Sequence, residues 1–328
     1  MAQHHFIPQT YLRGFATDDD SERVYFYDRR IADKGVTKRL IQDVCSQNNL
    51  YRLLMDDGEY KDDLEQDFAT IAEPTFKDIV VKLLDCAPLS PKEKSEFAAY
   101  ISLQIIRTPA SREMYNAMST EVMNRATNKQ WEKLLDDQER QRVMSEMKEE
   151  TGFDTSVLTK EDIQGIIDGT KFKTTWTIPK ENWLKHTMEI MGMIFRAFER
   201  MHWRIYFAAP GTAFITSDNP VSVLVPKPDG FYVGSGFLNR GSIRFFPLTK
   251  NACLTITDNE PSGFSFADAN KRRVQQINNV TALSHHKIII SHSPQLLTRW
   301  VKRIPDGFSL TEAVKEYQAQ DILMGKYD

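Results

Sequence analysis

The chain has 328 residues, with 42 Lys and Arg against 45 Asp and Glu, a formal net charge of −3 and a sequence pI near 6.2. Hydrophobic residues make up 41% and charged residues 27%, a composition that excludes fibrous and intrinsically disordered chains. A charge so close to zero also excludes a global field that would draw the whole protein to nucleic acid or anionic lipid.

The N-terminal residues 1–6 have neither the basic region nor the apolar region of a signal peptide. The most apolar stretch, Ala98–Ile106, is interrupted by polar residues and falls far short of the roughly 20 residues that span a bilayer. Three cysteines, Cys45, Cys86 and Cys253, are odd in number and far apart, which predicts reduced thiols. We therefore expect a cytoplasmic protein with no membrane partner.

The first third of the chain predicts two strands and then two helices. Arg23–Arg29 alternates aromatic and polar residues as a strand does, and Leu50–Met55 is a second candidate strand. Apolar residues recur at helical spacing over Asp62–Leu84, where Pro74 should divide the helix. The next helix begins at a Ser-Pro-x-Glu signature and should run from Ser90 to about Arg107.

The middle of the chain is helical. Charged helices are expected over residues 110–169, with a break at Thr151-Gly152. Lys180–His202 predicts the clearest amphipathic helix, because its apolar residues fall on one face. These residues are Leu184, Met188, Met191, Phe195 and Phe198.

After Trp203 the pattern changes to short β-branched or aromatic runs between Pro, Gly, Asp and Asn residues, which is typical of antiparallel strands. The expected strands are Arg204–Ala208, Ala213–Thr216, Ser222–Val225, Phe231–Val233, Ser242–Phe246 and Cys253–Thr257. A helix capped by Asp268 and running to about Leu283 should follow, then a buried strand, Lys287–Ser291, and a final helix, Pro294–Arg303. Ser284-His285-His286 is interpreted as a strand edge without a role.

These elements predict an α+β fold in which a helical half packs on a mainly antiparallel β-sheet. We expect one compact body over residues 1–328. Its subregions are residues 1–60 with short strands, the helical 61–202, the β-rich 203–292 with one helix, and a C-terminal helix and tail over 293–328.

Two polar motifs stand out, His4–Phe15 (HHFIPQTYLRGF) and Phe214–Val221 (FITSDNPV). With them the chain resembles the bacterial family known as domain of unknown function 4238, which opens on His-His-x-x-Pro-x-x-Tyr-Leu-Arg-x-Phe and carries a Thr-Ser-Asp-Asn-Pro strand end. Four shorter features also resemble the family: Arg107-Thr108-Pro109, Trp203, Phe246-Pro247-Leu248 and Asn278. The resemblance spans nearly the whole chain and implies no activity.

The motif residues allow a chemical and a structural interpretation. His4 or His5 could act as a general base or metal ligand, or one imidazole could pack while the other is solvated. Asp218 could bind a metal or act as a base and Asn219 could orient a substrate, yet Asp-Asn-Pro is also what a plain turn requires. We predict that the opening histidines and the Asp218 strand end meet in space.

Further candidates lie on helices. Glu65, eight residues before Glu73, could supply a carboxylate for a metal or could simply face solvent. Arg107 could clamp a phosphate or could only complement a helix C-terminus. The basic clusters Lys271–Arg273 and Arg299–Arg303 are compatible with phosphate contact, and solvated helix faces explain them equally.

Two functions remain open. The first is a metal-assisted phosphoester hydrolase, a nuclease included, with His4, His5, Arg107, Asp218 and Asn219 as catalytic residues and Glu65, Asp218 and His5 binding Mg²⁺ or Mn²⁺. Its partner would be nucleic acid or a phosphorylated small molecule. The second is a non-catalytic binding module in which the same residues form a structural network. The chain lacks GxxxxGK[ST], GxGxxG, HExxH and GxSxG motifs, which disfavours those enzyme classes.

Overall fold

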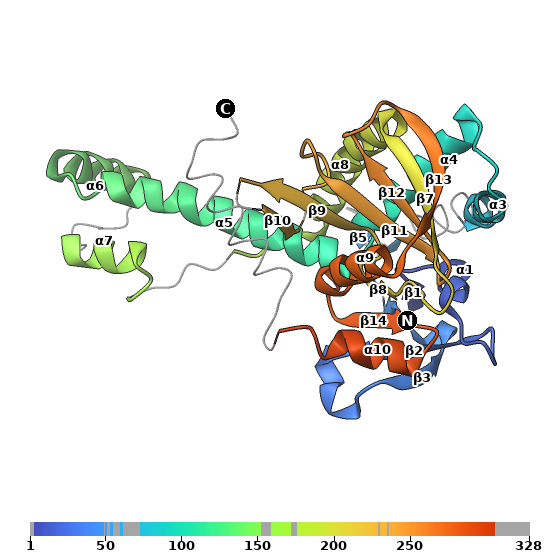
Figure 1. Cartoon of the computed structure of the whole chain (residues 1–328). Helices are drawn as coiled ribbons and strands as arrows, with labels where there is room; N and C mark the ends of the chain where they lie inside the picture. Colours follow the sequence, from blue (N-terminus) through green and yellow to red (C-terminus); the bar gives the residue numbers. More distant parts are fainter. Residues whose placement is uncertain are drawn as a thin grey trace. The chain divides into compact units, whose positions relative to one another are not determined.

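The computed structural model of the chain is shown in Figure 1. It describes residues 3–48, 50, 53–54, 60–61, 73–151, 159–171, 176–228, 230–234 and 236–305. The fold is α+β, which confirms the predicted class. Two units can be distinguished: Met1–Glu113 with Leu184–Asp328, and Met114–Trp183. The expectation of a single compact body stays a prediction.

A six-stranded sheet forms the larger β-layer of the first unit, with the strand order β10-β9-β11-β12-β7-β13. All neighbours in it are antiparallel except β13 and β7, which run parallel. Its strands are β7 (His202–Ala208), β9 (Ser222–Lys227), β10 (Gly230–Val233), β11 (Ile243–Thr249), β12 (Ala252–Thr257) and β13 (Gly263–Ala269).

A separate four-stranded antiparallel sheet joins the two ends of the chain, in the order β3-β2-β14-β8. It contains β2 (Arg23–Asp28), β3 (Thr37–Leu40), β8 (Thr216–Ser217) and β14 (Ile288–Ser291). Two small antiparallel pairs complete the described strands, β1 (Gln3–His5) with β4 (Ser46–Asn48) and β5 (Leu53–Leu54) with β6 (Tyr60–Lys61).

The helices of the first unit start with α1 (Gln9–Leu12) and three 3₁₀ segments at Arg13–Phe15, Arg29–Lys34 and Ile41–Asp43, followed by α3 (Glu73–Leu84), α4 (Pro91–Ile106), α9 (Lys271–Ser284) and α10 (Pro294–Val301). The second unit is built from α5 (Pro109–Lys133), α6 (Asp137–Thr151) and α7 (Lys160–Ile167). Two helices belong to both units: α5 has its first residues in the first unit, and α8 (Lys180–Arg200) has most of its residues there. The predicted start of α4 is confirmed, because Ser90 and Glu93 form a capping box.

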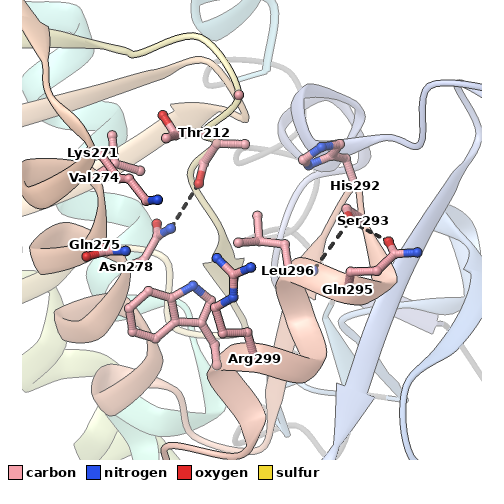
Figure 2. A pocket seen from close by; sticks show the side chains of 13 residues that line it. Thr212, Lys271, Val274, Gln275, Asn278, His292, Ser293, Gln295, Leu296 and Arg299 are labelled. Atoms are coloured by element: carbon pink, nitrogen blue, oxygen red, sulfur yellow. Dashed lines mark hydrogen bonds between the residues drawn. The ribbon is translucent and has the colours of Figure 1, made fainter.

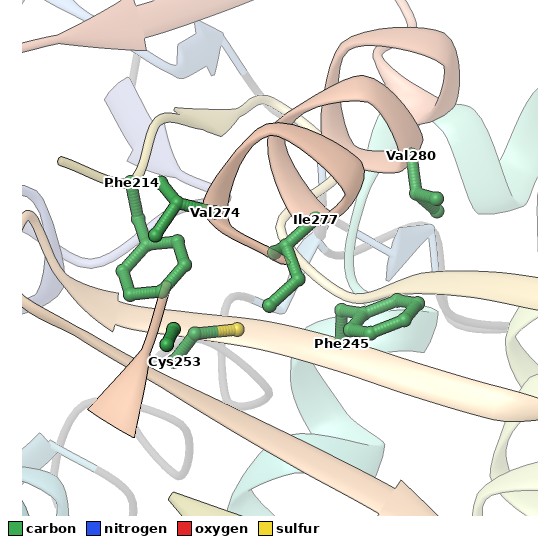
Figure 3. Close-up of a cluster of buried hydrophobic side chains, with 7 residues drawn as sticks. Phe214, Phe245, Cys253, Val274, Ile277 and Val280 are labelled. Atoms are coloured by element: carbon green, nitrogen blue, oxygen red, sulfur yellow. The ribbon is translucent and has the colours of Figure 1, made fainter. Parts of the chain in front are cut away.

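The hydrophobic core lies between α9 and the six-stranded sheet. Val274, Ile277 and Val280 of the helix pack on Phe245 and Cys253 of the strands, as Figure 3 shows. A second packed group is aromatic: Tyr11 stacks on Phe246 at 5.3 Å, and Phe97 of α4 contacts both Phe246 and Trp203. This group fixes α1 and α4 against the sheet on which the helical part was expected to pack.

Some predicted boundaries are wrong. Residues 263–269 form the parallel strand β13, so α9 is capped by Asn270 and not by Asp268. The segment Ala213–Thr216 reaches strand geometry only at Thr216, within the four-stranded sheet. On α8, Met188 is 43% exposed, while the buried line runs through Thr187, Ile194 and Phe198.

Cys45, Cys86 and Cys253 are free, and Cys45 and Cys253 are buried. Among the described residues, no helix combines the length and apolar character needed to cross a membrane.

Gln104 of α4 has a fully buried side chain whose amide nitrogen and oxygen have no hydrogen-bond partner among the described residues. Because an unpaired buried amide is destabilising, Gln104→Leu should raise the free energy of unfolding by about 1–2 kcal/mol in a urea titration. Ser102→Ala is the matched control, since the equally buried Ser102 hydroxyl donates to the Ala98 carbonyl and its removal brings no gain. A less stable Gln104→Leu variant would contradict the prediction.

Candidate functional site

The opening segment is docked in the first unit by backbone pairing. His4 pairs with Gln47 and His5 with Ser46 in the β1–β4 ribbon, and the His4 side chain is fully buried. The His5 Nε2 lies 2.9 Å from the Gln42 carbonyl oxygen. Arg107, at the C-terminus of α4, donates to the His5 carbonyl oxygen at 2.5 Å, so the predicted histidine and arginine are in direct contact through the backbone.

Tyr11 connects the two motifs. Its hydroxyl donates to the Pro247 carbonyl oxygen at 2.8 Å and lies 2.6 Å from Thr216 Oγ1. Since a phenol has one proton, Thr216 is the donor in the second bond. The first motif is therefore bonded to the first residue of the Thr-Ser-Asp-Asn-Pro string, 205 residues further along the chain.

Asp218 and Asn219 end β8 and bind the connection between α9 and β14. The Asp218 carboxylate accepts from the backbone N–H of His286 at 2.9 Å and of Lys287 at 2.8 Å, one bond to each oxygen. The Asn219 side-chain amide donates to the Ser284 carbonyl oxygen at 2.9 Å. Both side chains are buried, with exposures of 2% and 9%, so the motif fixes the strand end to the end of the helix.

Burial decides the protonation behaviour of this region. It raises the pKa of Asp218 to about 6, against the lowering effect of the N–H groups of His286, Lys287 and Ile288. Burial lowers the pKa of His286 to about 4, although Glu113 lies 3.1 Å from its Nε2. Glu113 also contacts Lys287 Nζ at 2.9 Å, so a carboxylate and a lysine meet beside a neutral imidazole.

A cavity of about 410 Å³ adjoins the Asp218 carboxylate. Phe6, which follows His5, and Ser46 and Gln47, the strand partners of the two histidines, line the same cavity as Asp218. Neighbours of the two histidines thus line the same cavity as Asp218, while His4 and His5 are not among its lining residues. The remaining lining residues are Phe26, Asp28, Arg30, Arg39, Asp43, Val44, Cys45, Pro109, His286, Lys287 and Ile288.

The three predicted ligands of Mg²⁺ or Mn²⁺ are Glu65, Asp218 and His5, and the structure describes two of them. Both Asp218 oxygens are occupied by backbone N–H groups, and the His5 ring bonds a carbonyl oxygen. Glu65 lies outside the described residues. Within the described ranges, no group of three or more His, Cys, Asp or Glu residues is arranged to hold a metal ion. The metal and catalytic assignments of these residues stay predictions.

Several residues at this site were missed from the sequence. Asp28, Arg30 and Glu113 received no role, and His286 was interpreted as a plain strand edge. Asp28 and Arg30 form an ion pair at 2.6 Å that lines the cavity. Two adjacent histidines before an apolar strand were the available signal for His286, because polar groups at a strand end often serve a neighbouring element.

The arrangement defines an α+β protein in which the opening motif is bonded to the Thr-Ser-Asp-Asn-Pro motif, and the latter is bonded to the connection between α9 and β14. Residues 3–295 match the family described as protein of unknown function, DUF4238, and the chain belongs to that family. Neither the curated proteins nor the solved structures include a match to the chain.

Proposed function

We propose that the protein is a non-catalytic binding module, in which the polar residues of the two motifs form a structural network. The observation that carries this proposal is the state of Asp218, whose two carboxylate oxygens each accept a backbone N–H in the interior. These two bonds use about half of the acceptor capacity of the carboxylate and hold it in place, and the side chain is only 2% exposed.

The other motif side chains support the same proposal. Asn219 bonds the Ser284 carbonyl, Tyr11 bonds Thr216 and Pro247, and Arg107 bonds the His5 carbonyl. Buried polar groups that satisfy one another specify how distant segments come together, because an unpaired alternative is costly. On this proposal, the partner of the module binds a different surface.

A metal-assisted phosphoester hydrolase, a nuclease included, is the competing proposal. It is favoured by the lining of the 410 Å³ cavity, where the carboxylates of Asp28, Asp43 and Asp218 lie with Arg30 and Lys287. Acidic side chains could bind Mg²⁺ or Mn²⁺ there, and a basic one could offset charge on a phosphoryl group of nucleic acid or of a phosphorylated small molecule.

The two proposals differ in what a metal does to thermal unfolding. If the module is non-catalytic, MnCl₂ leaves the melting temperature of the wild type unchanged. The network itself is tested by Tyr11→Phe, which should lower the free energy of unfolding by about 1–2 kcal/mol, because it removes both bonds of a buried hydroxyl. Tyr27→Phe is the control, since Tyr27 lies in β2, is only half-buried and belongs to neither motif.

If MnCl₂ raises the melting temperature of the wild type and leaves that of Asp218→Asn unchanged, the result supports the hydrolase proposal and contradicts the binding-module proposal. Metal-dependent hydrolysis of bis(p-nitrophenyl) phosphate that disappears in the same variant would lead to the same conclusion.

The cellular location of the protein is also part of this proposal. We place the protein in the bacterial cytoplasm, where its three cysteines, free in the structure, would remain reduced.

A further inference from the structure

A second cavity, of about 460 Å³, lies between α9 and α10 and uses none of the motif residues discussed above except Asn278. Figure 2 shows Lys271, Gln275 and Asn278 of α9 on one side and His292, Leu296 and Arg299 on the other. The remaining lining residues are Gly211, Thr212, Ala213, Val274, Ser293, Gln295 and Trp300.

The charge of this cavity is positive. Lys271 and Arg299 line it, no carboxylate does, and neither cation has an ion-pair partner in the part of the chain that the structure describes. Asp18 acts on His292, and its carboxylate is bound by Lys250 at 2.5 Å. The described lining therefore carries a net positive charge.

Both helices also present their N-terminal ends to the cavity. Lys271 is the first residue of α9, and Ser293 is the N-cap of α10. The N-terminal end of a helix carries a partial positive charge, which favours an anion, although the cap residues Asn270 and Ser293 already bind one backbone N–H at each end. The helix dipoles thus act in the same direction as the two side-chain cations.

Two lining residues carry buried ring nitrogens without a partner in the described part of the chain. Trp300 is only 2% exposed, and its Nε1 has no hydrogen-bond partner among the described residues. The buried Nδ1 of His292 is in the same state. Nearly all buried polar groups in folded proteins are paired, so the unpaired Trp300 N–H, which can only donate, points to a ligand with acceptor atoms.

The walls are firm and partly apolar. Asn278 accepts from the backbone N–H of Ile215 at 3.0 Å and donates to the Ala213 carbonyl at 2.9 Å, which fixes one rim. Val274 and Leu296 give an apolar surface between the polar groups. The volume falls within the range of roughly 300–1,000 Å³ that small-molecule sites have, which favours a small ligand over a polymer.

We propose that this cavity binds a small phosphorylated molecule, with its phosphate against Lys271, Arg299 and Trp300 Nε1 and its organic part on Val274 and Leu296. The sequence alone does not show whether the basic clusters Lys271–Arg273 and Arg299–Arg303 contact phosphate. In the structure Lys271 and Arg299 line the cavity, and the other basic residues of the two clusters do not. The inference holds whether or not the Asp218 region is catalytic, because it rests on separate residues.

Isothermal titration of the full chain with ADP and with inorganic pyrophosphate tests the proposal. Both should bind the wild type. Arg299→Gln should weaken ADP binding about tenfold or more, because it removes a charge-assisted hydrogen bond to the phosphate. Arg272→Gln is the matched control: Arg272 is exposed, neighbours Lys271 and does not line the cavity, so its variant should bind as the wild type does.

Trp300→Phe separates the buried donor from simple charge attraction. It keeps an aromatic ring and removes Nε1–H, so ADP binding should weaken severalfold while urea unfolding checks that the core remains intact. Arg299 is exposed, so its variant keeps the test decisive even if Trp300→Phe does not fold.

A single-stranded oligonucleotide is titrated in parallel. Three results would overturn the proposal: no binding heat with ADP or pyrophosphate, equal weakening of ADP binding in Arg272→Gln and Arg299→Gln, or binding of the oligonucleotide alone. The last result would assign the cavity to a nucleic-acid phosphate instead. None of them bears on the Asp218 network, whose test is metal-dependent unfolding.

Discussion

Arg244→Met should lower the free energy of unfolding by about 3 kcal/mol, because it removes a buried cation whose partners stay behind. Arg244 lies in β11 and is 1% exposed. Its guanidinium donates to the carbonyl oxygens of Phe237 at 2.8 Å, Ser242 at 2.7 Å and Asn239 at 3.0 Å. It also pairs with Asp258 at 3.3 Å. One side chain thus fixes the segment that leads into β11.

Urea unfolding followed by tryptophan fluorescence measures this effect. Arg240→Met is the control, since Arg240 lies in the same segment and is exposed. Arg244→Lys should recover only part of the loss, because an ammonium group lacks the planar fork that reaches three carbonyl groups. If Arg244→Met and Arg240→Met unfold at the same urea concentration, the hydrogen bonds and the ion pair of Arg244 do not stabilise the fold.

Asp218→Asn should change the pH dependence of stability by about 2 kcal/mol between pH 4 and pH 6. The folded-state pKa of Asp218, about 6, lies above its unfolded value of 3.8. Its contribution to stability is therefore fully present below pH 3.8 and is lost as the pH rises through 6. The wild type should lose stability relative to the asparagine variant over this interval.

The comparison with the variant is needed because two neighbours act in the opposite direction. Burial lowers the pKa of both His285 and His286 to about 4, so their contributions grow as the pH rises toward 6.5. Asp218 is not among the groups that shift the pKa of either histidine, so both contributions should be the same in the two proteins and drop out of the difference at each pH. The exposed Asp268→Asn serves as the control. A wild-type minus variant difference that stays flat from pH 4 to pH 6 would mean that the Asp218 pKa is not raised.

Local signals in the sequence predicted local structure well. The capping box at Ser90 and the alternation of Arg23–Asp28 were sufficient because each depends on residues a few positions apart. The strand Gly263–Ala269 was missed, although Phe264 and Phe266 alternate with polar or small residues. Asp268 looked like a cap and drew the helix start two residues too early, while Asn270 bonds the Arg273 N–H.

The candidate site was only partly accessible from the sequence because its bonds are to the backbone. Asp218 was correctly singled out as a polar strand end, yet its partners are N–H groups of His286 and Lys287, which no side-chain pattern reveals. The pairing of β1 with β4 was invisible for a related reason, since strands of three residues carry almost no periodicity. The cavity between α9 and α10 requires two helices to meet, and their basic clusters alone cannot show that.

The order of strands in the four-stranded sheet has a consequence for synthesis on the ribosome. β2, at residues 23–28, and β8, at residues 216–217, both pair with β14, at residues 288–291. Until β14 has been translated, β2 has only β3 beside it and one open edge, and β8 has no partner strand in its sheet. The N-terminal part of the nascent chain must therefore wait for nearly all of the sequence before this sheet can close, which is a period of exposure to chaperones and to misassembly.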